Sequence, residues 1–114
     1  MKNQFFQFDQ GKTLKAARKA AVRSGFTLTR SEEQLIEAVQ GDGLLFSRYA
    51  LSVTVSATNT GYIKVSAECR LERKGVIGQL VSEEIEENLL DKVTRMLTAR
   101  AANFFVTEPV LVAA

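Results

Sequence analysis

Histidine is absent from this sequence, and cysteine occurs once, at Cys69. Without histidine the chain lacks the usual general base, the commonest metal ligand and the usual switch near neutral pH. A single cysteine cannot form an internal disulfide, and with no histidine beside it a zinc site or a cysteine nucleophile would need unusual partners. We therefore expect no catalytic residues, no metal and no cofactor, and the chain is predicted not to be an enzyme.

Long apolar runs are missing as well. No segment approaches the roughly 20 apolar residues of a membrane-spanning helix. The N-terminal stretch "MKNQFFQFDQGK" is too short and too polar for a signal peptide. These absences predict a soluble protein of a reducing cytoplasm, with no membrane partner.

Neither sign of charge dominates, since the sequence has 15 basic and 13 acidic residues and a net charge of +2. This balance is too small by itself to indicate a nucleic-acid partner. The 114 residues, of which 46% are apolar, suit one folded domain with its own core. We expect a single domain over residues 1–105 and an extended C-terminal tail over residues 106–114.

Two segments have the apolar periodicity of helices. Residues 10–24 follow Asp9, a predicted N-cap, and precede Gly25, where a left-handed residue is needed. Small side chains such as Ala17 and Ala21 face their support, so this helix can lie close to it or leave space for a small apolar ligand. Residues 83–103 follow Ser82, a second predicted cap, and carry a broader apolar stripe. Residues 4–8, "QFFQF", are apolar enough for a short leading strand or a packing arm.

Between these helices the sequence alternates as strands do. "FTLTR" (26–30) and "QLIEAVQ" (34–40) are predicted to pair with Leu28 opposite Ile36. "LSVTVSATNTGYIKVSAE" (51–68) is predicted to form a hairpin around Gly61, a register that places Leu51 opposite Cys69 and apolar residues opposite each other throughout. The predicted fold is therefore an α+β two-layer sandwich, a four-stranded antiparallel sheet with two helices on one face.

The other face of this sheet would carry hydroxyl-bearing side chains with a few apolar ones. Its candidate interface residues are Leu35, Val39, Thr54, Ser56, Tyr62 and Lys64. The predicted face lacks the aromatic platforms on which RNA bases stack. A moderate protein contact and plain solvent exposure are both open interpretations, and Leu35 and Val39 favour the contact.

The first helix is strongly basic, and its candidate anion-binding residues are Lys12, Lys15, Arg18, Lys19 and Arg23. One interpretation is a surface for the phosphates of nucleic acid or lipid headgroups. The favoured one is a solvated face, matched by acidic counter-charges of the second helix at Glu83, Glu84, Glu87 and Asp91. The neighbouring carboxylate pairs, Glu86-Glu87 among them, are all expected to be solvated. The apolar tail is expected to dock as a strand, to stay disordered or to act as a degradation signal.

The stretches "AARKAAVRSGFTLTRSEEQLIEAV", "LSVTVSATNTGYIKVSAECR" and "EENLLDKVTRML" together resemble, in layout, a broad group of small bacterial α+β domains of unassigned function. The repeated domains of an outer-membrane-assembly lipoprotein are similar in outline. This chain departs from the lipoprotein because it has no lipid-attachment signal. The resemblance implies the order helix, antiparallel meander, helix, and it assigns no functional residue.

These observations together predict a non-catalytic cytoplasmic bacterial domain that acts through protein–protein contacts, with self-association as a homodimer. The alternative is binding of an anion or a nucleic acid through the basic first helix. Nucleic acid is the less favoured partner of the two.

Overall fold

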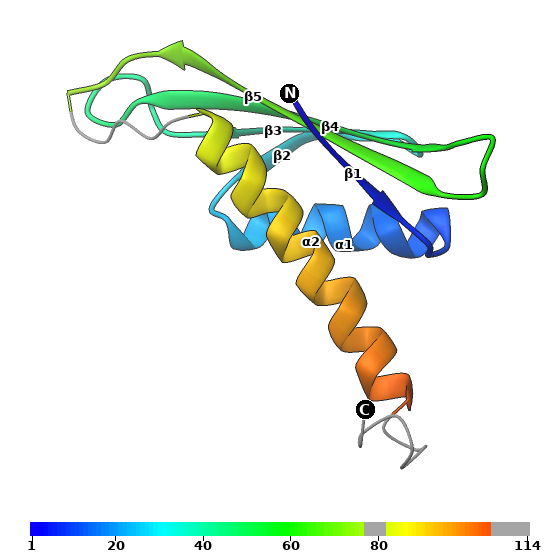
Figure 1. The fold of residues 1–114 in the computed structure, drawn as a ribbon. Helices are drawn as coiled ribbons and strands as arrows, with labels where there is room; N and C mark the ends of the chain where they lie inside the picture. Colours follow the sequence, from blue (N-terminus) through cyan, green and yellow to red (C-terminus); the bar gives the residue numbers. More distant parts are fainter. Residues whose placement is uncertain (77–81, 106–114) are drawn as a thin grey trace.

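The computed structural model describes residues 1–76 and 82–105, with side chains as far as Thr98. In this part of the chain, five strands form one antiparallel sheet and two helices lie on one side of it (Figure 1). Neither of these two helices lies on the opposite side of the sheet, which we call the open face. This arrangement has the two-layer α+β character that the sequence predicts.

The sheet has the spatial order β1-β5-β4-β3-β2, and every neighbouring pair of strands is antiparallel. Its strands are β1 (Lys2–Phe6), β2 (Thr27–Ser31), β3 (Leu35–Gln40), β4 (Arg48–Ala57) and β5 (Ile63–Arg73). The helices are α1 (Gln10–Arg23) and α2 (Ser82–Phe105). Strands β2 to β5 therefore form a meander, and β1 is added beyond its last strand.

The prediction of a four-stranded sheet is wrong, because the first residues of the chain form a fifth strand. β1 pairs with β5 from Lys2↔Ala67 to Phe6↔Ile63. So short an apolar segment cannot be told from a packing arm by its periodicity. Its strand character depends on β5, which supplies an edge with unpaired backbone groups.

Helix α1 begins and ends where the sequence predicts. Asp9 caps it, with Oδ2 accepting the backbone N–H of Lys12 at 3.1 Å, and Gly25 follows it with φ of +91°. Ala17 and Ala21 are completely buried in the core. Side chains this small let the helix approach the sheet closely, and their complete burial favours close packing over the alternative of a bound ligand.

The predicted register of the β4–β5 hairpin is confirmed. Leu51 lies opposite Cys69 and Val55 opposite Val65, and the N–H of Thr58 donates to the carbonyl of Tyr62 at 2.9 Å. The inward-facing residues of both strands are buried from Tyr49 to Val55 on β4 and from Ile63 to Cys69 on β5, whereas Ala57 and Leu71 at the ends are exposed. Those of β5 pack against α2, whose Leu89, Val93 and Leu97 are at most 1% exposed, and those of β4 lie against α1. Figure 1 shows the C-terminal end of α2 (orange) extending away from the sheet.

The predicted register of β2 and β3 is wrong by two residues. Leu28 lies opposite Ala38 rather than Ile36, and Ile36 pairs with Ser31. A bulge between Leu28 and Arg30 inserts an extra residue into β2, so the strand continues to Ser31. At Leu28 the shift of two residues keeps the side chain on its predicted face, and Ile36 and Ala38 are buried as predicted. Beyond the bulge the extra residue turns Arg30 to the other face, where it lies opposite Glu37.

Two glycines with positive φ give a matched test of the fold. Gly41 has φ of +91° and Gly61 has φ of +86°, so alanine is strained at both. A Cβ on Gly41 would also overlap the carbonyl of Ser47, whereas a Cβ on Gly61 meets no atom within 4 Å. We expect Gly61→Ala to lower the free energy of unfolding by about 1 kcal/mol and Gly41→Ala by about 3 kcal/mol or more, in denaturant titrations. Equal losses would contradict the packing of the β3–β4 loop.

Candidate functional site

Cross-strand pairing brings most of the predicted interface residues together on the open face. Leu35 of β3 lies opposite Thr54 of β4, and Ser56 of β4 lies opposite Lys64 of β5. Thr54 is exposed, and the other three are partly buried. The remaining two predicted residues lie further out, with Val39 paired to Ala50 and Tyr62 at the end of the hairpin.

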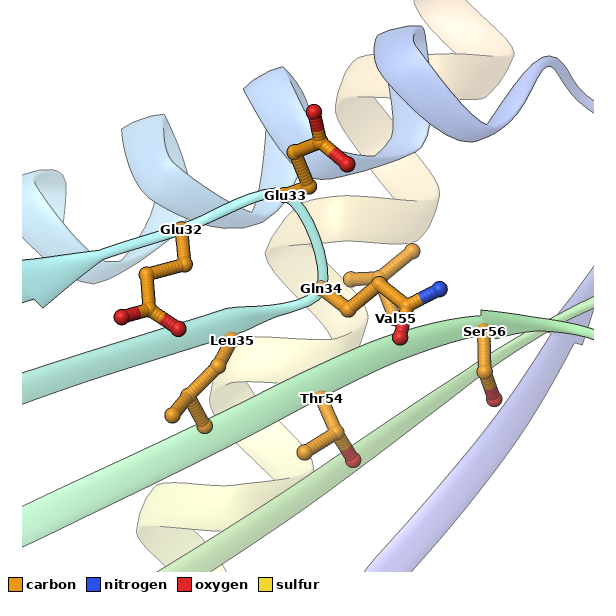
Figure 2. A pocket seen from close by; sticks show the side chains of 7 residues that line it. All are labelled: Glu32, Glu33, Gln34, Leu35, Thr54, Val55 and Ser56. Carbon is orange, nitrogen blue, oxygen red and sulfur yellow. The ribbon is translucent and has the colours of Figure 1, made fainter.

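A hollow of about 630 Å³ opens where the β2–β3 turn meets β4 (Figure 2). It is lined by Glu32, Glu33, Gln34, Leu35, Thr54, Val55 and Ser56. Figure 2 shows Leu35, Thr54 and Ser56 pointing to one side of the sheet, whereas Glu33 points to the side on which α1 lies. The hollow exists because β3 begins at Leu35 while β4 continues past that point.

The polar groups around this hollow differ in their partners. Arg30 Nη2 lies 2.8 Å from Glu32 Oε1, and Arg30 Nη1 lies 3.4 Å from Glu37 Oε1, so both carboxylates are matched. Within the described residues Glu33 forms no ion pair. The hollow therefore combines hydroxyl groups, an amide, an apolar side chain and one unmatched negative charge, a set that suits a polypeptide segment.

An aromatic side chain that is absent from the predicted interface also lies on the open face. Phe5 of β1 lies opposite Lys64 and is 53% exposed. Together with Tyr62, which is 39% exposed, it gives this end of the face two accessible aromatic rings. The sequence "NQFF" could have indicated this position. If the segment is a strand with Phe6 facing inward, alternation requires Phe5 to face outward.

A second apolar surface lies at the other end of the sheet, in the loop before β4. This loop cluster consists of Leu44, Leu45, Phe46 and Val76, which are between 47% and 85% exposed. Asp42 Oδ1 accepts the N–H groups of Leu44 at 2.8 Å and Phe46 at 3.0 Å, which lowers the pKa of Asp42 and fixes the loop. The N–H of Val76 donates to the carbonyl of Leu44 at 3.2 Å. The run "LLF" between a glycine and a serine is the sequence signal for this surface.

The basic residues of α1 lie where the sequence predicts, on the side of the helix away from the sheet. Lys12, Lys15, Lys19 and Arg23 are exposed, and Arg18 is partly buried. None of the five forms an ion pair with a carboxylate of the described residues.

Of the counter-charges predicted on α2, Glu83, Glu84 and Asp91 form no ion pair within the described residues. Glu87 pairs with Lys2 of β1 at 3.2 Å. At the C-terminal end of α1, α2 presents Lys92, whose Nζ donates to Ser24 Oγ at 2.9 Å. In the described part of the chain, α1 therefore keeps its positive charge unmatched.

The expectation that every carboxylate pair is solvated is wrong for Glu86, which is 2% exposed. Its Oε2 accepts the backbone N–H of Cys69 at 2.7 Å, and the Met1 ammonium lies 3.5 Å from Oε1. Cys69 lies on β5 two residues beyond the last pairing with β1, so its N–H has no strand partner there. The Glu86 carboxylate therefore supplies the hydrogen-bond acceptor that a neighbouring strand would otherwise give to this buried N–H.

No group of three or more histidine, cysteine, aspartate or glutamate side chains in residues 1–76 and 82–105 is arranged to hold a metal ion. None of the helices within these ranges has the length and apolar character needed to cross a bilayer.

Comparison with known proteins finds no family model that matches the chain and no matching curated protein. The resemblance in layout to small bacterial α+β domains stays a prediction, since it rests on the order of elements alone.

The environment of Cys69 gives a testable reactivity. Burial, reinforced by the Glu86 carboxylate, raises the pKa of the thiol to about 11 from 9.0. We expect the folded protein to resist iodoacetamide at pH 8 and the unfolded protein to react, because the thiolate is the nucleophile. The raised pKa stabilises the fold fully below pH 9, and this contribution is lost as the pH rises from 9 through 11.

A Ser56→Cys variant is the control for this experiment, because Ser56 lies on the open face. It should be labelled once at pH 8 without unfolding, as mass spectrometry will show. Rapid labelling of Cys69 in the folded wild type would contradict the buried environment assigned to it.

Proposed function

We propose that this chain is a non-catalytic cytoplasmic bacterial domain that acts through protein–protein contacts and forms a homodimer. The observation that carries the proposal is the open face, where Leu35, Thr54 and Ser56 line one side of the hollow on a sheet surface that neither described helix covers. A face with hydroxyl groups, scattered apolar side chains and few charges is suited to a moderate protein interface. Phe5 and Tyr62 add the aromatic area that such interfaces favour.

The composition supports the non-catalytic part of the proposal. The sequence has no histidine, and its single thiol is buried with a raised pKa. A nucleophile needs an accessible position and a base beside it. Cys69 offers neither feature, whereas the open face offers a broad contact surface.

The proposed contact surface is tested by replacing Leu35, which lines the hollow. We expect Leu35→Glu to reduce recovery of a specific partner at least tenfold when the tagged chain is isolated from its native cell, because a buried charge opposes the contact. Asn59→Glu adds the same charge in the exposed β4–β5 turn and should leave recovery unchanged. Both variants should retain the wild-type unfolding temperature. Equal recovery by both variants would count against the open face as the contact surface.

A second function, binding of a polyanion such as nucleic acid, is supported by one specific observation. The five basic residues of α1 have no carboxylate partner among the described residues, contrary to the counter-charge interpretation. Four of them are exposed on one side of the helix. A row of unmatched cations attracts phosphates, and binding to the phosphates releases the counterions of the nucleic acid.

This second function predicts a steep dependence on salt. Five phosphate contacts to single-stranded DNA would lower the affinity roughly a hundredfold between about 50 and 200 mM salt. Fluorescence anisotropy with a labelled oligonucleotide measures this dependence. Lys15→Ala with Lys19→Ala should weaken binding at low salt, whereas Lys64→Ala on the open face is the control. No binding at 20 mM salt would remove the hypothesis.

A further inference from the structure

The outer edge of β1 has backbone groups without a partner among the described residues. The N–H of Val55 donates to Gln34 beside β3, so the opposed residue Val65 directs its own N–H toward β1. Val65 lies opposite Gln4, which is therefore turned toward β5. Alternation along β1 then leaves the N–H and C=O groups of Asn3 and Phe5 facing away from the sheet.

The other edge of the sheet is protected against pairing. β2 is interrupted by the bulge between Leu28 and Arg30. Arg30 lies on this strand as a charged side chain, held by Glu32 and Glu37. Bulges and edge charges are devices that prevent a strand from pairing with another chain.

Among the described residues, β1 has no comparable protection. Its pairing with β5 runs without a register shift from Lys2 to Phe6, so the strand is regular. The charge of its one lysine is engaged on the helix side of the sheet, because Lys2 Nζ lies 3.2 Å from Glu87 Oε1. Asn3, Gln4 and Phe5 are all exposed, and Phe5 is apolar. A regular, exposed edge with apolar content is the kind that pairs with another strand.

We propose that two copies of this chain pair through β1, antiparallel and around a two-fold axis at Gln4, to form one continuous sheet across both copies. The inference rests on the homodimer of the proposed function and places the contact between the two copies at β1, which leaves the open face for a partner of another sequence. With Gln4 opposite Gln4 of the second copy, Asn3 lies opposite Phe5 of the second copy. Each such pair exchanges two N–H···O bonds, so the four free backbone groups of each copy are all satisfied. A two-fold contact of this kind uses the same surface on both copies.

The size of the contact determines its strength. Two short strands bury less than the roughly 1,200 Å² of a standard interface, so the dimer should be weak and dependent on concentration. The Phe5 rings lie on the open-face side of the junction and add apolar area there. The two open faces join into one larger surface, and Leu35 with its hollow stays free for a protein of another sequence.

A disulfide trap tests the register directly. Opposed residues in a non-hydrogen-bonded antiparallel pair have Cα atoms about 4.5 Å apart, within the range that a disulfide spans. Gln4→Cys should therefore give a disulfide-linked dimer under mild oxidation, reversed by a reductant, at least tenfold faster than Ser31→Cys on the opposite edge. The native Cys69 is 5% exposed and should not interfere. Equal rates of cross-linking for the two variants would overturn the proposal.

A proline substitution tests the hydrogen bonds. Asn3→Pro removes an outward N–H and leaves the ladder to β5 intact, as edge strands tolerate. Analytical ultracentrifugation should show at least a tenfold weaker dimer, with an unchanged unfolding temperature in dilute solution. Ser31→Pro on β2 and Leu35→Glu on the open face should retain the wild-type dimer.

The outcomes separate this inference from the proposed function. A dimer that survives Asn3→Pro but is lost with Leu35→Glu overturns the β1 contact and leaves the homodimer in place. A wild type that stays monomeric up to about 1 mM, the concentration matching a binding free energy near −4 kcal/mol, overturns the inference. The role of the open face as a contact surface is then tested separately, by the recovery of a partner with Leu35→Glu.

Discussion

The pairing of β4 with β5 is the constraint on which the rest of this structure depends. Its register runs from Tyr49↔Leu71 to Ala57↔Ile63 and places valine, leucine and alanine side chains together on one face. A slip of one residue would turn these side chains to solvent and bury serine, threonine and lysine. Both helices cover the apolar face because that face excludes water, and the polar face stays open for the same reason.

β5 extends beyond the residues that pair with β1, and this extension helps to position α2. Where the pairing stops, the buried N–H of Cys69 needs an acceptor, and Glu86 of α2 supplies a carboxylate oxygen at 2.7 Å. Apolar contacts of Leu89, Val93 and Leu97 hold the same helix further along. The start of α2 is therefore positioned by a specific polar contact, and the rest of its described length is held by non-directional burial.

Three surfaces of different chemistry remain after the core is built. The open face combines hydroxyl groups with scattered apolar side chains, the loop cluster is apolar, and α1 presents cations without partners among the described residues. The chemistry of all three surfaces suits binding, and pairing through β1 would enlarge one of them without covering it.

Local patterns in the sequence by themselves determined the hairpin register, the ends of α1 and the face on which each predicted interface residue lies, because alternation and capping act between near neighbours. Only the tertiary structure decided that Lys2–Phe6 is a strand, that Leu28 lies opposite Ala38, that Glu86 is buried and that Phe5 joins the open face. Each of these depends on a partner distant in the chain or on a bulge that periodicity does not reveal. A free edge of β5 makes β1 a strand, and an unpaired N–H on that edge makes a buried carboxylate favourable.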